Sequence, residues 1–554
     1  MSNFFGQLFE ILKQDERFIS VDGQFLRNAT FQAAMTFDKK LLKLLLDNEV
    51  TRKNFFEEVD GLIIFDKLKF AWTVNNRQFL PDSYTRFKNK IGLANDYQDF
   101  YSQSNNVELI FPYKDCVLEG GQTKDDQKRT EIFYNARLAP DEVDRLFEPK
   151  VFVNAKKFSA DGEQVAEKFS DEDNLIIKGN NLLALASLQK KFLGKINCIY
   201  IDPPYNTDND TFGYNDKFSR STWLVFMKNR LELAKKLLTD DGAIYVQIDY
   251  HQAHYLKVLM DEIFGEENFQ REIIWRIGWL SGYKTKDNNW IRNHDTILFY
   301  SKNHRKLNFI KNYIPRSEFK STANTKIERY PIEDVWNGNE YDDLNSIAIV
   351  SYSGETVSKM LKSKDEVKGQ KSEKLIERII KAHTKAGDIV LDFFGGTGTT
   401  AAVAMKTGRR FIICEQLDRH IEIMLKRLEK VIDGEQSGVS RKNNWQGGGN
   451  FIYCELAKQN ENFVEEIYAA ENFETLKKIS DRIFASGYIN YKIDLKKFEE
   501  NISDFAMLSL ENQKKFLLEL LDKNLLYVSY NDIDDEEFKI SAADKNFSRS
   551  FYGE

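Results

Sequence analysis

The chain has 554 residues, a formal net charge of −7, 42% hydrophobic residues and 13% aromatic residues. This length exceeds one ordinary hydrophobic core and predicts three or four domains, and the composition excludes a disordered chain. No apolar run of about 18 residues occurs, and residues 1–5 lack the basic start of a signal peptide. We therefore expect a cytoplasmic protein that makes no membrane contact.

The four cysteines, Cys116, Cys198, Cys414 and Cys454, are far apart in the sequence. None of them belongs to a Cys-x-x-Cys pair, and the six histidines complete no zinc-binding pattern. We therefore expect four reduced thiols and no metal site.

Residues 1–95 are predicted to be a mostly helical N-terminal region. The run of leucines at 41–46 indicates a wide apolar helix face, and residues 59–65 predict a turn and a short strand. No catalytic pattern occurs there, so a structural cap is favoured over a role in binding DNA or a partner. Residues 96–160 form a bridge with strand and turn character, in which a helix over 139–147 ends before Pro149.

The next segments predict half of a doubly wound sheet. A strand at 175–178, a turn at Gly179, a helix and a second strand at 196–201 form a βαβ unit, which implies parallel strands. A helix over 222–238, a strand over 243–249 and a helix ending near 264 continue the pattern. We assign residues 96–268 to the first part of the sheet domain.

The second of these strands ends in Asp202, Pro203, Pro204 and Tyr205. Proline fixes φ and has no N–H, so the two prolines form a stiff exit from the strand. The Asp202 carboxylate and the Pro203 carbonyl can both accept hydrogen bonds from one amino group, and Tyr205 offers a ring on which a base can stack, worth roughly 1–3 kcal/mol. Two prolines alone usually indicate only a turn after a strand. The complete sequence Asp-Pro-Pro-Tyr after an apolar strand is a far more specific signal of a functional site.

Residues 269–370 break the alternation of strands and helices. Antiparallel strands are predicted near 273–275 and 296–300, with a polar loop at 284–289 between them. Residues 271–330 contain 13 Lys and Arg residues against 5 Asp and Glu residues. This local excess favours a phosphate-contacting surface over a solvated basic face, and we interpret 269–370 as an inserted target-recognition region.

The sheet pattern returns in residues 371–440. A helix over 373–383 precedes a strand at 389–394, the glycines Gly395, Gly396 and Gly398, a helix from about 400, and a strand that ends in Glu415. Strand, glycine turn, helix, strand and acid in this order indicate a nucleoside-cofactor site. The turn lacks the lysine of a P-loop and the spacing of a dinucleotide fingerprint. Glu415 is expected to accept hydrogen bonds from both ribose hydroxyls of the cofactor. Asn180 either contacts the cofactor adenine or caps a helix.

Residues 441–554 are predicted to be a helical C-terminal region that contacts a partner or a second copy of the chain. Gly447, Gly448 and Gly449 form a hinge-like break, residues 451–453 predict a strand, and the polar last twenty residues are expected to be partly mobile.

These two motifs together resemble those of the β-class amino-group DNA methyltransferases, in which the catalytic motif precedes the cofactor motif. More narrowly, the chain resembles the modification (Mod) subunits of type III restriction-modification systems. The resemblance is carried by Ile201 to Thr207, Phe212 to Asp216, Trp223, Lys228 to Arg230, Leu391 to Thr400, and the subfamily-specific segment Tyr113 to Gly121.

The resemblance implies a class I methyltransferase fold of permuted motif order, an α/β doubly wound and mostly parallel sheet. It also implies S-adenosylmethionine as the methyl donor and adenine N6 in double-stranded DNA as the acceptor, reached by base flipping. A restriction (Res) helicase-nuclease partner and a homodimer are further expectations. The implied catalytic residues are Asp202, Pro203, Pro204 and Tyr205, and the implied cofactor residues are Asp392, Phe394, Gly396, Thr397, Gly398, Glu415, Asn180 and Lys371.

Two positions depart from the family pattern. Thr397 stands where the family usually has serine, and the hydroxyl is kept. Lys371-Ser372 stands where the family usually has Lys-Pro, in a segment that lines the methionine end of the cofactor. Asn206, Thr207 and Asp216 are expected to support the site, and Trp223 is expected to be core.

Several alternatives remain open from the sequence. One is a solitary adenine methyltransferase without a restriction partner, and another is a non-catalytic DNA-binding specificity subunit. Cytosine N4 methyltransferases more often have serine before the two prolines, and enzymes that modify RNA or protein usually have asparagine at the place of Asp202. No ATP-binding Gly-x-x-x-x-Gly-Lys-Ser/Thr motif occurs, so any DNA cleavage must belong to a partner.

Overall fold

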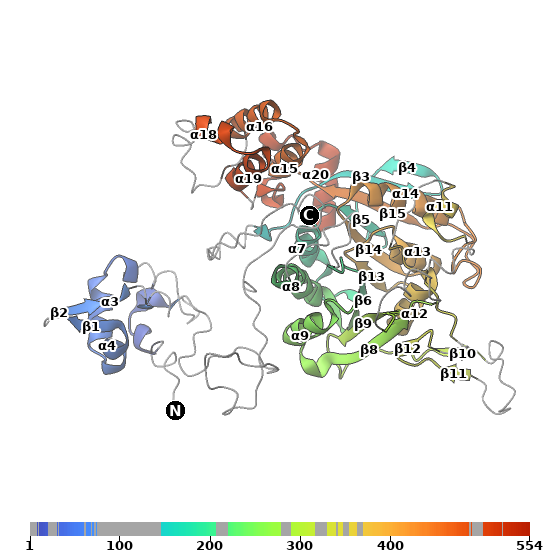
Figure 1. Ribbon diagram of the computed structural model, residues 1–554, viewed down its shortest axis with the longest axis horizontal. Helices are drawn as coiled ribbons and strands as arrows, with labels where there is room; N and C mark the ends of the chain where they lie inside the picture. Colours follow the sequence, from blue (N-terminus) through green and yellow to red (C-terminus); the bar gives the residue numbers. More distant parts are fainter. Residues whose placement is uncertain are drawn as a thin grey trace. The chain divides into compact units, whose positions relative to one another are not determined.

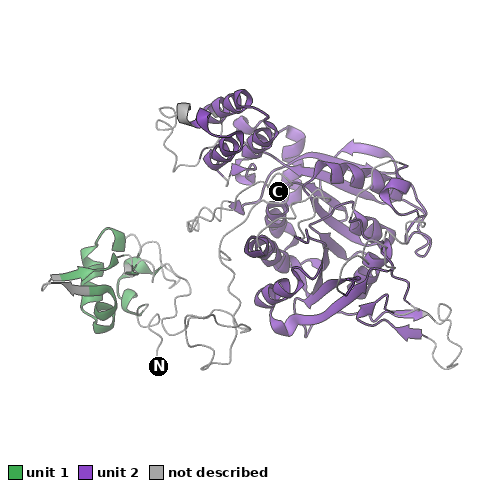
Figure 2. Ribbon diagram, viewed as in Figure 1, with its two compact units in different colours: residues 1–90 green, residues 91–554 purple. Residues whose placement is uncertain are grey.

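The computed structural model of the protein describes part of the chain and divides it into two compact units, residues 1–90 and 91–554 (Figure 2). The described residues are 8, 10–19, 30, 33–59, 62–67, 69–70, 74, 146–206, 220–278, 290–315, 329–338, 342–346, 354–362, 369–486, 489, 502–522 and 525–554. The predictions for residues 96–145, for the loop 284–289 and for the motif residues 207–216 lie outside them. The two units are described separately.

The N-terminal unit has its own small core. Helices α3 (Lys39–Leu46) and α4 (Glu49–Phe55) are capped by Asp38 and Asn48, whose side chains accept hydrogen bonds from the first free N–H groups. Leu41, Leu45 and Phe55 form part of a buried cluster. The predicted turn and strand near 59–65 correspond to a hairpin of β1 (Phe56–Val59) and β2 (Leu62–Phe65), and a short 3₁₀ helix, η1 (Glu16–Phe18), precedes α3.

The larger unit is built on a sheet of eleven strands in the order β12-β8-β9-β7-β6-β13-β14-β5-β15-β3-β4 (Figure 1). Its central strands are mutually parallel, which confirms the predicted fold class. They correspond to the predicted strands and have the bounds β5 (Leu175–Lys178), β6 (Ile196–Ile201), β7 (Leu238–Ile248), β13 (Ile389–Asp392) and β14 (Arg410–Glu415).

Helices cover both faces of this sheet (Figure 1). Alternate residues of β6 separate the two layers, since Ile199 and Ile201 join one buried cluster and Cys198 and Tyr200 join another. One face carries α7 (Asn181–Phe192), α8 (Arg220–Leu237) and α9 (Ala253–Phe264), and the other carries α12 (Glu373–His383), α13 (Thr399–Lys406) and α14 (Asp418–Ile432). The central strands are therefore buried on both faces, as parallel strands normally are.

Residues 269–370, which the sequence predicts to be an insertion, begin with the two predicted antiparallel strands. β8 (Phe269–Arg276) follows the short helix η4 (Glu266–Asn268) and pairs with β9 (His294–Ser301), which is antiparallel to β7 and so extends the sheet. A separate small hairpin and short elements follow, namely β10 (Tyr313–Pro315), β11 (Arg329–Pro331), β12 (Val335–Trp336) and α11 (Val357–Met360). β12 adds parallel to β8 at the sheet edge.

The sheet continues beyond residue 440, where we expected it to end. β15 (Asn450–Leu456) lies between β5 and β3 (Phe152–Ser159), and β4 (Gly162–Val165) pairs with β3 at the edge. The sequence shows only one short apolar run here, whereas the position in the sheet depends on strands some 300 residues earlier in the chain.

The last twenty residues include a helix that packs on β3, so the expectation that they are partly mobile is wrong for this helix. In α20 (Ala542–Tyr552), Phe547 and Phe551 are fully buried, and the Ser548 hydroxyl donates to the Phe152 carbonyl at 3.0 Å. The polar residues of this helix concealed its apolar face. The other C-terminal elements are α15 (Asn460–Ala469), α16 (Phe473–Ser486), α18 (Ile502–Met507), α19 (Leu510–Leu520), η9 (Tyr530–Asp532) and η10 (Glu536–Phe538).

Cys198, Cys414 and Cys454 are buried free thiols, as expected, and Cys116 lies outside the described residues. Burial raises the pKa of the Cys198 thiol to about 12. None of the helices in the described part of the chain has the length and apolar character that crossing a bilayer requires.

Candidate active site

The two sequence motifs meet at the switch point of the sheet. β6 and β13 are parallel neighbours, with Cys198 opposite Val390 and Ile199 opposite Leu391. The chain leaves β6 toward β7 on one side and leaves β13 toward β14 on the other, which opens a crevice at the carboxyl ends of these strands.

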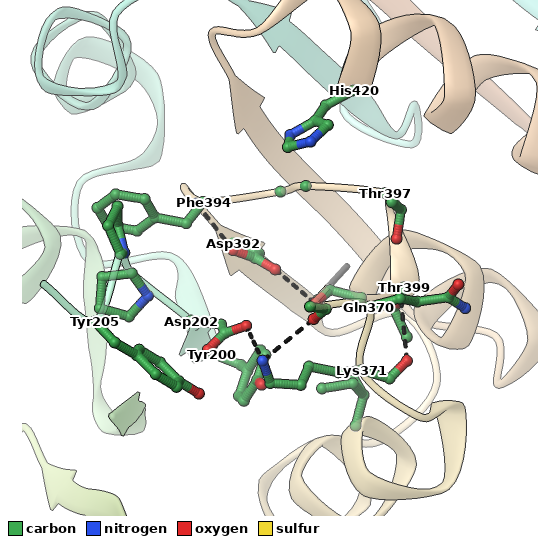
Figure 3. A pocket seen from close by; sticks show the side chains of 17 residues that line it. Tyr200, Asp202, Tyr205, Gln370, Lys371, Asp392, Phe394, Thr397, Thr399 and His420 are labelled. Atoms are coloured by element: carbon green, nitrogen blue, oxygen red, sulfur yellow. Dashed lines mark hydrogen bonds and ion pairs between the residues drawn. The ribbon is translucent and has the colours of Figure 1, made fainter. Parts of the chain in front are cut away.

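This crevice is a cleft of about 860 Å³, including its open mouth (Figure 3). Both motifs contribute to its wall, which consists of Tyr200, Asp202, Pro203, Pro204, Tyr205, Gly369, Gln370, Lys371, Ile376, Asp392, Phe394, Gly395, Gly396, Thr397, Thr399, Thr400 and His420.

Asp202 begins the loop directly after β6. Its Oδ2 accepts a hydrogen bond from the Lys371 ammonium, whereas its Oδ1 is buried without a hydrogen-bond partner among the described residues. Burial raises the pKa of Asp202, and the nearby Lys371 opposes that shift. A buried acceptor without a partner costs free energy, and because this one lines the cleft it is available to a ligand that donates.

Trp223 holds the two-proline segment that follows β6. This residue is fully buried, as predicted, and its indole N–H donates to the Pro204 carbonyl at 2.8 Å. Asn206 follows in the left-handed region at φ 57°, a conformation that asparagine tolerates. Thr207 and Asp216 lie outside the described residues.

Tyr205 is held by a buried polar chain that sequence reasoning missed. Its hydroxyl donates to Asp295 Oδ2 at 3.3 Å, and Gln247 Nε2 donates to the same oxygen at 3.1 Å. Tyr200 in turn donates to Gln247 Oε1 at 2.8 Å, and Arg292 pairs with Asp295 Oδ1. Gln247 on β7 and Asp295 on β9 come from separate parts of the chain, so no local pattern indicates their role.

The glycine turn after β13 is held by Asp392. Its Oδ1 accepts from the Phe394 N–H at 3.0 Å, and its Oδ2 accepts from the Thr400 hydroxyl at 2.6 Å. Gly396 lies in the left-handed region at φ 51°, and a Cβ there would meet only the Phe394 carbonyl oxygen, at 3.9 Å. This glycine therefore presents bare backbone to the cleft.

Glu415, Gly398 and Asn180 are not among the residues that line the cleft. Glu415 is buried at the end of β14, and its Oε2 accepts from the Gly396 N–H at 2.7 Å, so it braces the glycine turn. Gly398 packs against α14, where a Cβ would approach Met424 Cγ to 2.5 Å. Asn180 is the N-cap of α7 and accepts from the Leu182 N–H at 3.0 Å, which matches the capping alternative.

The remaining wall residues differ in how well the sequence indicates them. Gly395, Thr399 and Thr400 are contiguous with the predicted motif, and His420 follows the acidic strand end at the start of α14. Gly369, Gln370 and Ile376 carry no local signal of a site.

A buried ionic cluster stabilises the glycine turn through hydrogen bonds to the residues that follow it. Arg427 of α14 is fully buried and donates to the Thr399 hydroxyl at 2.8 Å, to the Thr397 carbonyl at 3.3 Å and to Glu373 at 2.9 Å. Glu373 also pairs with the buried Lys406 at 2.8 Å. Lys406 also pairs with Glu435, so two cations face two carboxylates, which is the condition under which buried ions persist.

Asp392 is expected to make stability depend on pH. Burial raises the pKa of Asp392 from 3.8 to about 7, so the folded chain binds this proton more tightly than the unfolded chain. The contribution is fully present below the unfolded pKa and is lost as the pH rises toward the folded pKa. Asp392→Asn is isosteric and neutral, so its melting temperature relative to wild type should be higher at about pH 8 than at about pH 5. A difference that stays constant with pH would contradict the shift.

Comparisons with known proteins agree with both motifs. A family model described as DNA methylase matches residues 196–426, and a model described as type III restriction/modification enzyme methylation subunit matches residues 38–93. The probable type III restriction-modification enzyme HindVI Mod subunit of Haemophilus influenzae is 33% identical, over 93% of this chain and 94% of that protein. The EcoP15I Mod subunit of Escherichia coli is 33% identical over 26% of each chain.

Among solved structures, the M1.HpyAVI–SAM complex is 19% identical with a TM-score of 0.30, and the match covers 46% of this chain and 99% of that one. The family assignment depends on the sequence relatives instead, because the HindVI match extends over nearly the whole of both chains. On this ground the chain belongs to the Mod subunits of type III restriction-modification systems.

Proposed function

We propose that the protein is a site-specific DNA methyltransferase that transfers a methyl group from S-adenosylmethionine to N6 of adenine in double-stranded DNA. It serves as the modification and DNA-recognition subunit of a type III restriction-modification system. The observation that carries this proposal is that the Asp202 motif and the Asp392 glycine turn face each other across a shared cleft (Figure 3).

The residues present fit the methyl donor. Asp392, Phe394, Gly396 and Thr397 line one half of the cleft, and the bare backbone at Gly396 permits close approach of a nucleoside. S-adenosylmethionine supplies an activated methyl group on its sulfonium. Thr397 keeps the hydroxyl of the usual serine, and Glu415 acts through the turn that it braces, in addition to the predicted contact with ribose hydroxyls.

The other half of the cleft would hold the adenine. The target base must leave the duplex stack to reach a pocket of this kind, and the Tyr205 ring provides a surface for stacking. Asp202 Oδ1 and the Pro203 carbonyl accept hydrogen bonds from the amino group and direct the nitrogen lone pair toward the methyl group. Bound S-adenosylmethionine would supply the methyl group and leave as the neutral thioether, and the amino group would give up one proton to solvent. Positioning and electrostatics account for the acceleration, so no histidine base is required.

The other regions complete the proposal. We assign base readout to residues 269–370, whose described part includes the exposed Trp290 and Arg292, which pairs with Asp295. We assign residues 441–554 to contacts with partners, namely the Res subunit and a second copy of the chain in a homodimer. The protein would act in the cytoplasm, where it meets double-stranded DNA.

Sequencing that maps modified bases tests the function directly. In DNA from cells that express the protein and lack other adenine methyltransferases, we expect N6-methyladenine at one short sequence. Expression of Asp202→Ala should leave the same sites unmodified. N4-methylcytosine, or no modified base with the wild-type protein, would contradict the proposal. Co-purification with a helicase-nuclease would distinguish a type III system from a solitary methyltransferase.

A further inference from the structure

The Lys371 ammonium contacts two residues of the predicted catalytic motif, Asp202 and Tyr205. Its Nζ donates to Asp202 Oδ2 and, at 3.3 Å, to the Gly369 carbonyl, and it lies 5.3 Å from the centre of the Tyr205 ring (Figure 3). The Lys371 side chain is 14% exposed and the Asp202 side chain is 20% exposed, so this ion pair is largely shielded from water. We expected Lys371 to contact the cofactor, but its ammonium group binds the Asp202 carboxylate instead.

The geometry of Asp202 makes this contact useful for catalysis. One carboxylate oxygen is bound to the lysine, and the other, Oδ1, is buried at the cleft with no hydrogen-bond partner among the described residues. Binding one oxygen to a cation restricts rotation of the carboxylate and leaves the second oxygen in a defined direction. An amino group can therefore be accepted at Oδ1 without displacing the lysine.

The backbone around Lys371 is anchored on each side. The Gln370 amide accepts from the Val357 N–H at 3.0 Å and donates to the Glu355 carbonyl at 2.8 Å. The Thr399 hydroxyl donates to the Lys371 carbonyl at 3.4 Å. Two residues further on, Glu373 belongs to the buried ionic cluster with Arg427. The starting point of the lysine side chain is therefore fixed by groups outside the cleft.

Lys371 also acts on the charge of Asp202. Burial raises the pKa of Asp202, Lys371 and, to a smaller degree, the Tyr205 hydroxyl lower it, and the neighbouring Asp295 adds the smallest upward contribution. The other titratable groups near the carboxylate are Tyr205, Tyr200 on β6 and Asp392 on the adjacent strand β13. Lys371 is the cation in contact with Asp202, whereas Arg292 pairs with Asp295, and a protonated Asp202 would lose acceptor capacity for the amino group.

We propose that Lys371 is a positioning residue that holds Asp202 ionised and turned so that Oδ1 faces the target amino group. This inference rests on the proposed function and assigns Lys371 to the catalytic half of the cleft. Its contribution is made through Asp202, and cofactor binding does not depend on its charge.

Lys371→Met and Lys371→Arg test the inference in the full-length protein. The assay measures transfer of tritiated methyl groups from S-adenosylmethionine into unmethylated genomic DNA between about pH 6 and pH 9.5, beside a cofactor titration. We expect Lys371→Met to lower kcat about 10²-fold near neutral pH, because a misdirected acceptor is costly, with little change in cofactor Kd. Its activity should recover as the pH rises, since the pKa of Asp202 increases when the cation is lost. Lys371→Arg should restore much of the rate and the wild-type pH profile.

Lys374→Met is the matched control, because Lys374 lies on the first turn of α12, is 47% exposed and pairs with Asp343. It should behave as wild type.

Weaker cofactor binding by Lys371→Met with an unchanged pH profile would overturn the inference and assign the lysine to the cofactor. A higher rate would also overturn it and identify the lysine as a block on the site. If Lys371→Met does not fold, a shifted pH profile in Lys371→Arg overturns the inference, and a wild-type profile supports it. Activity of Asp202→Ala in the same assay would instead refute the proposed function.

Discussion

Replacing Asp202 with alanine is expected to abolish methyl transfer, by roughly 10³-fold or more, because the chain loses the acceptor that orients the target nitrogen. The carboxylate lies at the carboxyl end of β6 with its free Oδ1 in the cleft. Cofactor affinity should change little, since the interaction is made with the base. Tritiated methyl incorporation and an S-adenosylmethionine titration measure the two quantities separately.

Asp240→Ala provides the control for this variant. Asp240 lies near the start of β7, its side chain is 61% exposed, and it pairs with Lys306 at the surface. Removing this carboxylate changes the net charge by the same amount and should leave methyl transfer unchanged. Persistent incorporation by Asp202→Ala would show that another group holds the amino nitrogen.

Replacing Gly396 with asparagine is expected to impair cofactor binding while the protein remains folded. Asparagine tolerates the left-handed backbone that Gly396 adopts, and a Cβ there meets no atom closer than 3.9 Å. Its side chain would project into the cleft and overlap the ligand. Overpacking of about 1–3 kcal/mol corresponds to roughly a 5- to 150-fold weaker Kd for S-adenosylmethionine, with loss of methylation at limiting cofactor.

Two further glycine variants control for backbone and packing effects. Gly194 has φ 66° and open space around its Cβ position, so Gly194→Asn makes the same change outside the cleft and should bind the cofactor normally. Gly398→Ala instead forces a Cβ toward Met424 Cγ at 2.5 Å and should lower the melting temperature. Calorimetric titration and thermal unfolding separate the two effects. Normal cofactor binding by Gly396→Asn would place the ligand elsewhere.

The local elements of the sheet domain could be predicted from the sequence. The strand at 196–201, the helix over 373–383 and the glycine turn after 392 all lie where their patterns indicate. Turn glycines, prolines and alternating apolar residues act through near neighbours in the chain, so a single sequence carries their signal. The strand near 451–453 was predicted for the same reason, but its place inside the main sheet was not.

The partners of the site residues could not be predicted in the same way. Nothing near Tyr205 indicates that Asp295 and Gln247 hold it, and nothing near Trp223 indicates that its indole binds Pro204. The C-terminal helix α20 was missed because its buried phenylalanines are spaced among polar residues. Buried polar groups must find partners wherever the packed chain brings them.

By itself, the sequence determined which segments are strands and helices along the chain, and it determined the chemistry of the two motifs. Both depend on residues that are adjacent in the chain. Only the tertiary structure decided that β6 and β13 are neighbours, and that their ends therefore share one cleft. It also decided that the Lys371 ammonium binds Asp202. The physical reason is that strand order and ion pairing depend on which distant segments bury one another, and apolar burial is not directional.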